Sequence, residues 1–237
     1  MIKTMGLGVQ FGAIRALDNV TLSIDDSPEI CGIIGPNGAG KSTFLSVIAG
    51  EIRPTEGEIE LFDKPMRSLS PVKACRMGVG RTFQIPRPFI EMTVEENIFT
   101  SGLCVSPLKE ARAKAKELLK LLDLENHAQS TPGQLNLAGR KRLELAKALM
   151  TEPKVLLSDE LFEGLNEKEV DWLVDLLKTH FAPKMKIIMV EHVLSALRKL
   201  ATKLYVLNQG QLIAEGETND ILASEQVIEA YLGRRKK

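Results

Sequence analysis

The sequence lacks a surplus of charge of either sign, because 31 lysine and arginine residues balance 31 aspartate and glutamate residues. Bulk binding of nucleic acid needs a basic surface, so this balance gives no support to such a role. Long apolar runs are also missing, and the longest stretches without Asp, Glu, Lys or Arg have about a dozen residues, such as Asn97 to Leu108. A membrane-spanning helix needs roughly 20 apolar residues, so we expect none.

Cysteine is scarce, and the three cysteines (Cys31, Cys75 and Cys104) form no CxxC or Cys/His pair. This argues against a disulfide framework or a structural zinc and favours a reducing cytosol. The N-terminal sequence MIKTMGLG has no apolar signal-peptide core. What remains is typical of a globular protein, with 44% apolar and 26% charged residues.

Strand signals occupy both ends of the sequence, whereas the middle reads as helix. Residues 7–11 and 16–24 predict strand, turn and strand, and the Ile-rich run 30–34 is typical of a parallel strand buried on both faces. We expect a helical insertion between the strands of an α/β core, and a solvated basic tail at Arg234–Lys237. Further strands are expected over 58–62, 155–157, 187–190, 205–207 and 212–214, and helices over 41–49, 109–122, 139–150 and 167–180.

A glycine-rich loop lies between the strand expected at 30–34 and the helix expected at 41–49. It fits GxxxxGK[ST] without a mismatch, in the strand–loop–helix setting that this pattern requires. Its glycines let successive N–H groups turn inward, and the helix start adds unpaired amides and a positive dipole end. We expect Lys41 to act in catalysis at the β- and γ-phosphates and Ser42 to bind Mg²⁺. The expected nucleotide-binding residues here are Gly35, Pro36, Asn37, Gly38, Ala39, Gly40, Lys41, Ser42 and Thr43.

An acidic pair, Asp159 and Glu160, follows the apolar run 155–157. Ligands of parallel sheets bind at the carboxyl ends of the strands, which is where such a pair would lie. We expect Asp159 to hold Mg²⁺, directly or through water, and Glu160 to polarise the attacking water. An apolar run followed by two acids is also common at ordinary strand ends. The pair therefore predicts a metal and water site only in combination with the glycine loop.

Two further polar residues are candidates for the same site. His192 ends the sequence IIMVEH, where a neutral imidazole can donate to a γ-phosphate, although a lone histidine is more often an ordinary hydrogen-bonded residue. Gln84 lies where the first core segment meets the helical insertion, and its carbonyl can reach Mg²⁺ or water. We assign no role to His127 or His180.

In this order, the glycine loop, glutamine, helical insertion, acidic pair and late histidine resemble the ATP-binding subunit of ABC transporters over nearly the whole chain. Within that superfamily, FGAIRALDNVTL, GRTFQIPRPF, MTVEENI, RKRLELAKAL, GLN and VIEAYLG are similar to the branched-chain amino acid (Leu/Ile/Val) importer ATPases. The resemblance implies an α/β fold: a P-loop NTPase (RecA-like) core with an N-terminal antiparallel β part and a helical subdomain. The single nucleotide-binding domain, 1–237, would divide into a core (1–84 and 152–237) and a helical subdomain (85–151).

The resemblance also implies cofactors and partners, namely ATP with Mg²⁺ and a homodimer or heterodimer with a related ATPase subunit. Each ATP would lie between the glycine loop of one chain and the segment Leu135–Gly139 of the other, so that nucleotide-driven dimer closure powers transport. Phe11 would stack on adenine, unless it simply ends a strand in the core. Transmembrane permease subunits would bind a groove at Ile85–Phe99, with Phe89, Ile90 and Phe99 exposed, and place the chain on the cytoplasmic face of the plasma membrane. Nucleic acid is not expected as a partner.

The sequence departs from the family at its signature motif, LSGGQ. Only Leu135 matches within Leu135–Gly139; Asn136 can still hydrogen-bond the nucleotide of the other chain, but Leu137 and Ala138 make close backbone approach harder than glycines would. Asn136 and Ala138 remain our expected nucleotide-binding residues there, and Asn166 stands where the superfamily more often has Asp.

Three alternatives stay open at this point. One is an ABC ATPase of another system, such as urea/amide or lipopolysaccharide transport. Another is a weakly active module with a degenerate signature, and a third is a soluble ABC ATPase of DNA repair or ribosomes. Long coiled-coil insertions and tandem cassettes, which are usual in the third class, are missing. The presence of Lys41, Asp159, Glu160 and His192 favours an active ATPase.

Overall fold

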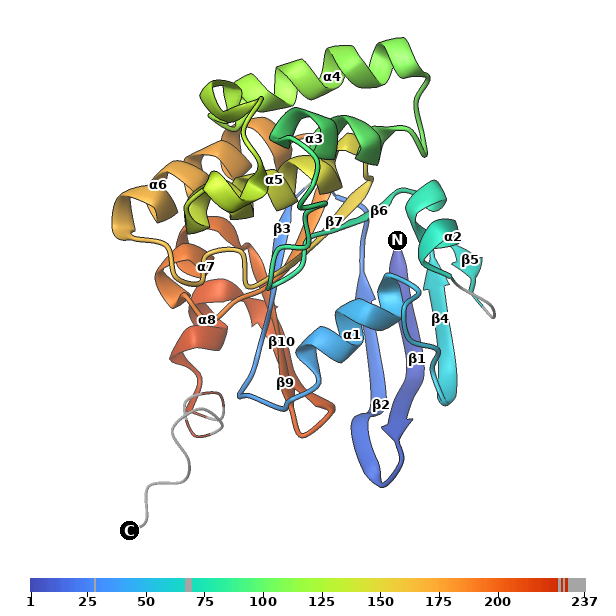
Figure 1. Ribbon diagram of the computed structural model, residues 1–237. Coiled ribbons are helices and arrows are strands. Elements are labelled where there is room, and N and C mark those ends of the chain that lie inside the picture. Colours follow the sequence, from blue (N-terminus) through green and yellow to red (C-terminus); the bar gives the residue numbers. More distant parts are fainter. Residues whose placement is uncertain (28, 67–69, 226, 228, 230–237) are drawn as a thin grey trace.

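The computed structural model describes residues 1–27, 29–66, 70–225, 227 and 229, so the expected basic tail Arg234–Lys237 lies outside the described residues. Two sheets and a set of helices form the molecule, with the N-terminal sheet on one side and the helices α3 to α5 at one end (Figure 1).

The central sheet has the strand order β10–β9–β3–β8–β7–β6. All its neighbouring strands run parallel except β10, which pairs antiparallel with β9. Because β3, β8 and β7 are neighbours and run parallel, the segments that follow these three strands leave the sheet at the same edge. The strands are β3 (Ile30–Ile34), β6 (Val79–Arg81), β7 (Val155–Asp159), β8 (Lys186–Val190), β9 (Lys203–Asn208) and β10 (Gln211–Glu217).

Alternate residues of the central strands face two hydrophobic clusters, as the period of two in a strand requires. In β3, Ile30 and Ile34 join the cluster formed with the helices, whereas Cys31 and Ile33 join the cluster beneath the N-terminal sheet. Both faces of the sheet are therefore covered, which explains why its strands are continuous apolar runs in the sequence.

The second sheet is antiparallel and has the order β2–β1–β4–β5. Its apolar residues share one hydrophobic cluster with the central sheet and with helix α1 (Lys41–Ile48), whose residues Phe44, Leu45 and Ile48 are fully buried. This packing fixes α1, and with it the glycine loop, between the two sheets (Figure 1). The strands of the second sheet are β1 (Ile2–Phe11), β2 (Ile14–Ile24), β4 (Glu56–Leu61) and β5 (Lys64–Pro65).

Residues 85–151 are all described, and they contain helices and no strand. Two of the helix starts have a clear local cause: Thr93 and Glu96 form a capping box for α3, and Asn136 caps α5. The elements are α3 (Val94–Gly102), α4 (Leu108–Leu121), α5 (Leu137–Met150) and 3₁₀ turns at Glu125–His127 and Pro132–Gln134. The remaining helices are α6 (Glu167–Leu176) with a π-helical turn at Leu177–Phe181, α7 (Leu194–Leu200) and α8 (Thr218–Ala223).

Several elements differ from the sequence predictions. The first strand begins at Ile2 rather than residue 7, and the helix expected at 139–150 begins at Leu137. The sequence does not predict strand β6, because three residues are too few to show a period. Helices α2 (Pro71–Met77) and α3 also escape prediction, since short helices interrupted by polar residues give a weak periodic signal.

Candidate functional site

The glycine loop follows β3 and leads directly into α1. Gly40, the residue before the helix, has φ +98°, and a Cβ atom there would lie 2.4 Å from the carbonyl oxygen of Ala16. No side chain caps the helix, so its first N–H groups remain available to an anion. The loop thus forms a concave main-chain site of the kind that binds phosphate.

Lys41 is buried within this loop, with 6% of its surface exposed. Its Nζ donates to the carbonyl oxygens of Gly35 at 2.7 Å and Pro36 at 3.0 Å. Burial lowers the pKa of Lys41, and the negative charges of Glu160 and Asp159 oppose that effect. These contacts place a cation against the inner side of the loop.

Ser42 and Asp159 lie far apart in the sequence but meet in the fold, because the helix start and the end of β7 lie at the same sheet edge. The Ser42 hydroxyl lies 3.2 Å from Oδ1 of Asp159, and Arg81 approaches Oδ2 at 3.6 Å. Burial raises the pKa of Asp159, while Arg81 and the Ser42 hydrogen bond lower it. A hydroxyl beside a carboxylate is a donor set that suits Mg²⁺ once phosphate oxygens complete it.

The carboxylate of Glu160 contacts the two other polar candidates, His192 and Gln84. Its Oε1 lies 2.9 Å from Nε2 of His192, and its Oε2 accepts a hydrogen bond from Nε2 of Gln84 at 2.6 Å. The same Gln84 amide reaches Glu163 at 3.3 Å. Burial raises the pKa of Glu160, the adjacent His192 lowers it, and the nearby Glu163 raises it further. A carboxylate paired with an imidazole can both accept a proton and orient water.

A cavity of about 580 Å³ joins these groups. Phe11, about half exposed at the end of β1, contributes to its wall beside the loop. Gly35, Pro36 and Asp159 do not line this cavity, although Lys41 and Ser42 connect them to it. The expected site residues that line it are Phe11, Asn37, Gly38, Ala39, Gly40, Lys41, Ser42, Thr43, Gln84, Glu160 and His192.

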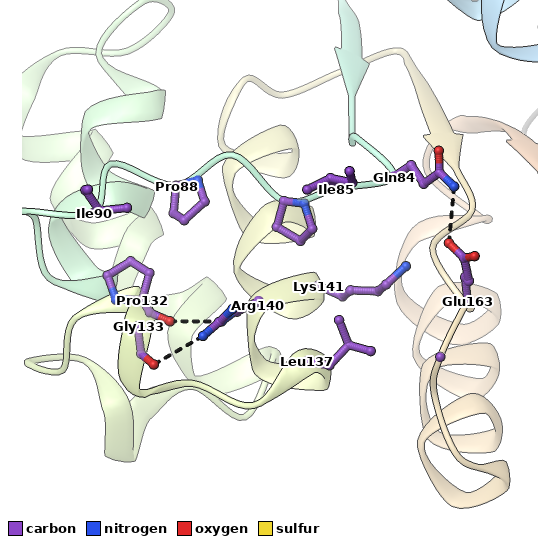
Figure 2. Close-up of a pocket in the computed structure, with 12 residues that line it drawn as sticks. Gln84, Ile85, Pro88, Ile90, Pro132, Gly133, Leu137, Arg140, Lys141 and Glu163 are labelled. Carbon is purple, nitrogen blue, oxygen red and sulfur yellow. Dashed lines mark hydrogen bonds between the residues drawn. The ribbon is translucent and has the colours of Figure 1, made fainter.

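Asn136 and Ala138 lie away from this cavity. The Asn136 side chain caps α5 by accepting a hydrogen bond from the Gly139 amide at 2.8 Å, and Ala138 is buried at 6% exposure. The neighbouring Leu137 is exposed and lines a second cavity of about 640 Å³ together with Gln84 and Ile85. Figure 2 shows this second cavity between the segment after Gln84 and the start of α5.

Sequence reasoning missed several charged residues of the site. Arg15 and Glu163 line the first cavity, Arg81 lies against Asp159, and the buried side chains of Lys141 and Glu191 lie near Glu160. Each comes from an element in which a lone charge is ordinary, so only the fold brings it to the site. The one available signal was Glu191, a charged residue between an otherwise apolar run and His192.

No helix formed by the described residues has the length and apolar character needed to cross a bilayer. A family model described as ABC transporter matches residues 17–163, and one described as branched-chain amino acid ATP-binding cassette transporter matches residues 211–237. The chain is 35% identical to the high-affinity branched-chain amino acid transport ATP-binding protein LivG of Salmonella typhimurium (strain LT2) and 36% identical to LivG of Escherichia coli (strain K12), with 98% of each chain covered in both cases.

Solved structures agree with this assignment. A nucleotide-free ATP-binding cassette from an ABC transporter superposes with a TM-score of 0.89 at 30% identity over 99% of both chains. The ADP conformation of the cassette MJ1267 gives 0.88 at 32% identity over 99% of both chains. The dimeric cassette MJ0796 gives 0.83 at 28% identity over 92% of this chain and 99% of that one. The chain therefore belongs to the ABC transporter family of ATP-binding cassettes and, by that membership, is an ATPase.

Proposed function

We propose that this chain is the ATP-hydrolysing subunit of a branched-chain amino acid importer, in which nucleotide-driven dimer closure powers transport. The observation that carries the proposal is the convergence of Lys41, Ser42, Asp159, Glu160 and His192 from separate segments on one sheet edge. The substrate class rests on the LivG relatives, whose names state branched-chain amino acid transport.

The loop at 35–43 would hold the ATP phosphates through its amides and Lys41. Ser42 and Asp159 would bind Mg²⁺, with Gln84 contributing its side-chain carbonyl, and the metal would offset charge on the phosphate oxygens. The exposed ring of Phe11 lies in the wall of the same cavity, where it can stack on adenine. The volume of about 580 Å³ is in the range usual for small-molecule sites.

Hydrolysis would use the Glu160–His192 pair. Glu160 would accept a hydrogen bond from the attacking water. His192, which contacts the same carboxylate, would also contact the γ-phosphate. Because the Glu160 side chain is mostly buried, at 12% exposure, its charge acts in a medium of lower dielectric than water. Its hydrogen bond from Gln84 ties this carboxylate to the segment that leads into the helices.

The active form would be a dimer of two such chains or of this chain with a related subunit. The first cavity is open, and the segment Leu135–Gly139 of the same chain does not line it. ATP that contacts the loop of one chain and this segment of the other would favour the closed dimer, because it makes both contacts only there. The solved structure of the similar cassette MJ0796 is dimeric, which supports a dimer for this chain.

The second cavity would accept a short helix of a transmembrane permease subunit and so hold the chain on the cytoplasmic face of the membrane. Ile85 and Ile90 are exposed and line it (Figure 2), and the exposed Phe89 precedes Ile90 in the sequence, which suits an apolar contact. Phe99 differs from our expectation of an exposed ring: it is half-buried and packs against the hydrophobic cluster formed with the helices. We treat residues 85–151 as the helical subdomain that carries this surface, with the core formed by 1–84 and 152–237.

Glu160→Gln tests the dimer. The amide keeps the shape of the side chain but cannot act as a base, so turnover should fall at least roughly 100-fold while ATP still binds. Under saturating Mg-ATP, light scattering after size-exclusion chromatography should then show a dimer. A monomer that binds ATP would contradict the sandwich.

Uptake in cells tests the substrate. Loss of the chain should abolish uptake of labelled leucine, isoleucine and valine, and the wild-type chain but not Lys41→Ala should restore it. Loss of urea or amide uptake alone would point to the alternative system.

A further inference from the structure

Glu160 has a backbone conformation that non-glycine residues rarely adopt, with φ +50°. L-residues lose free energy in this left-handed region, so they remain there only when their surroundings hold them. The amide of Glu160 donates to the carbonyl of Val190 at 2.8 Å, which continues the pairing of β7 with β8 by one residue. This hydrogen bond restrains only the amide side of residue 160.

Lys141 holds the carbonyl side of the same residue. Its Nζ donates to the carbonyl oxygen of Glu160 at 2.5 Å, from the first turns of α5, and only 4% of its surface is exposed. Burial lowers the pKa of Lys141, and the carboxylates of Glu191, Glu163, Glu160 and Asp159 oppose that effect. The nearby negative charges therefore stabilise the charged form of this buried lysine.

Glu191 holds the amides that follow. Its Oε1 accepts a hydrogen bond from the Phe162 amide at 3.0 Å, and the Leu161 amide also lowers its pKa. The residue is fully buried, and among the described residues its Oε2 has no hydrogen-bond partner. Burial raises the pKa of Glu191 to about 7, while Lys141 offers the compensating charge. A buried carboxylate with an unpaired oxygen lowers the stability of the fold, so its presence here indicates a role that offsets this loss.

The two residues after β8 therefore both contact the segment that begins at Glu160. His192 contacts the Glu160 side chain, and Glu191 contacts the main chain that follows it. Lys141 adds a third contact, to the Glu160 carbonyl, from helix α5, which begins within the segment Leu135–Gly139.

We propose that Glu191 and Lys141 are positioning residues, which clamp the backbone at 160–162 so that the Glu160 carboxylate faces His192 and the phosphate loop. The proposal rests on the proposed function where it assigns Glu160 to hydrolysis, but the clamp itself is a property of the folded chain. Neither residue lines the first cavity, so neither is expected to contact nucleotide.

Glu191→Ala tests the clamp through hydrogen exchange of the amides at 160–163, followed by mass spectrometry on the full chain. Loss of the acceptor should raise exchange at Phe162 at least roughly ten-fold. Glu191→Gln keeps an acceptor oxygen and should restore much of the protection. The matched control is Glu144→Ala, which removes another buried carboxylate on α5 that bonds the Arg87 amide, and which should leave exchange at 160–163 unchanged.

Turnover and nucleotide affinity separate positioning from general stability. Glu191→Ala and Lys141→Met should lower kcat at least roughly ten-fold and change the Kd for a fluorescent ATP analogue less than about two-fold. Unchanged exchange in Glu191→Ala, or an equal rise in Glu144→Ala, would overturn the clamp. If Glu191→Ala fails to fold, Lys141→Met and Glu191→Gln decide by the same kcat and Kd readings. A wild-type chain without turnover would refute the proposed role of Glu160 in hydrolysis, and the exchange experiment would still test the clamp.

Discussion

Gly40→Ala should strongly destabilise the protein even before nucleotide is considered. Gly40 has φ +98°, and a left-handed L-residue costs roughly 1–2 kcal/mol. A Cβ atom would also lie 2.4 Å from the backbone oxygen of Ala16 and 2.8 Å from the side chain of Leu17, and such overpacking adds about 1–3 kcal/mol. We therefore expect a total loss of about 2–5 kcal/mol, which is a large share of the roughly 5–15 kcal/mol of a typical domain.

Gly12→Ala is the matched control. Gly12 has φ +57°, and a Cβ atom added there would meet nothing within 4 Å, so only the backbone cost remains. Both substitutions reduce the entropy of the unfolded chain equally, so that contribution cancels in the comparison. Urea unfolding followed by circular dichroism should place Gly40→Ala about 1–3 kcal/mol below Gly12→Ala at equal m-value. Equal stability of the two variants would refute the steric reasoning.

Three further predictions concern single side chains. Lys41→Ala should abolish ATP binding or turnover in a coupled phosphate-release assay, and wild-type kinetics would remove the loop from the mechanism. Phe11→Ala should raise the Kd for ATP roughly 5- to 150-fold, since base stacking contributes about 1–3 kcal/mol, and unchanged affinity would show that the ring does not stack. Glu191 binds its proton more tightly in the folded chain, with a pKa of about 7 against the usual 4.5, so its contribution to stability falls as pH rises from 4.5 to 7. The wild type should lose up to about 3 kcal/mol relative to Glu191→Gln between about pH 4.5 and pH 8, and equal pH profiles in urea unfolding would contradict this.

The glycine loop, the acidic pair and the strands of the central sheet other than β6 could be predicted from the sequence, because each is a local pattern with a local cause. The loop needs glycines at fixed spacing, and strands buried on both faces need continuous apolar runs. The order of these pieces indicates the family, which the comparisons confirm. Helix α3 escapes prediction, since its capping box at Thr93 precedes a segment with few apolar residues.

The charged surroundings of Glu160 could not be predicted in the same way. Lysine side chains on helices usually reach solvent. Lys141 points inward because α5 packs in the hydrophobic cluster formed with the helices. Arg81 likewise reaches Asp159 because β6 lies beside β7. Such contacts join residues of different elements, so no periodic pattern in the sequence records them.

The two carbonyl bonds of Lys41 have a consequence for how a nucleotide enters. The ammonium donates hydrogen bonds to the carbonyl oxygens of Gly35 and Pro36, so it links the start of the loop to the first residue of α1. On ATP binding, Lys41 would exchange these carbonyl oxygens for phosphate oxygens, so the bonds that are lost would offset part of the enthalpy of the bonds that form. The carbonyl oxygens of Gly35 and Pro36 thereby take the place that phosphate oxygens would take at this ammonium.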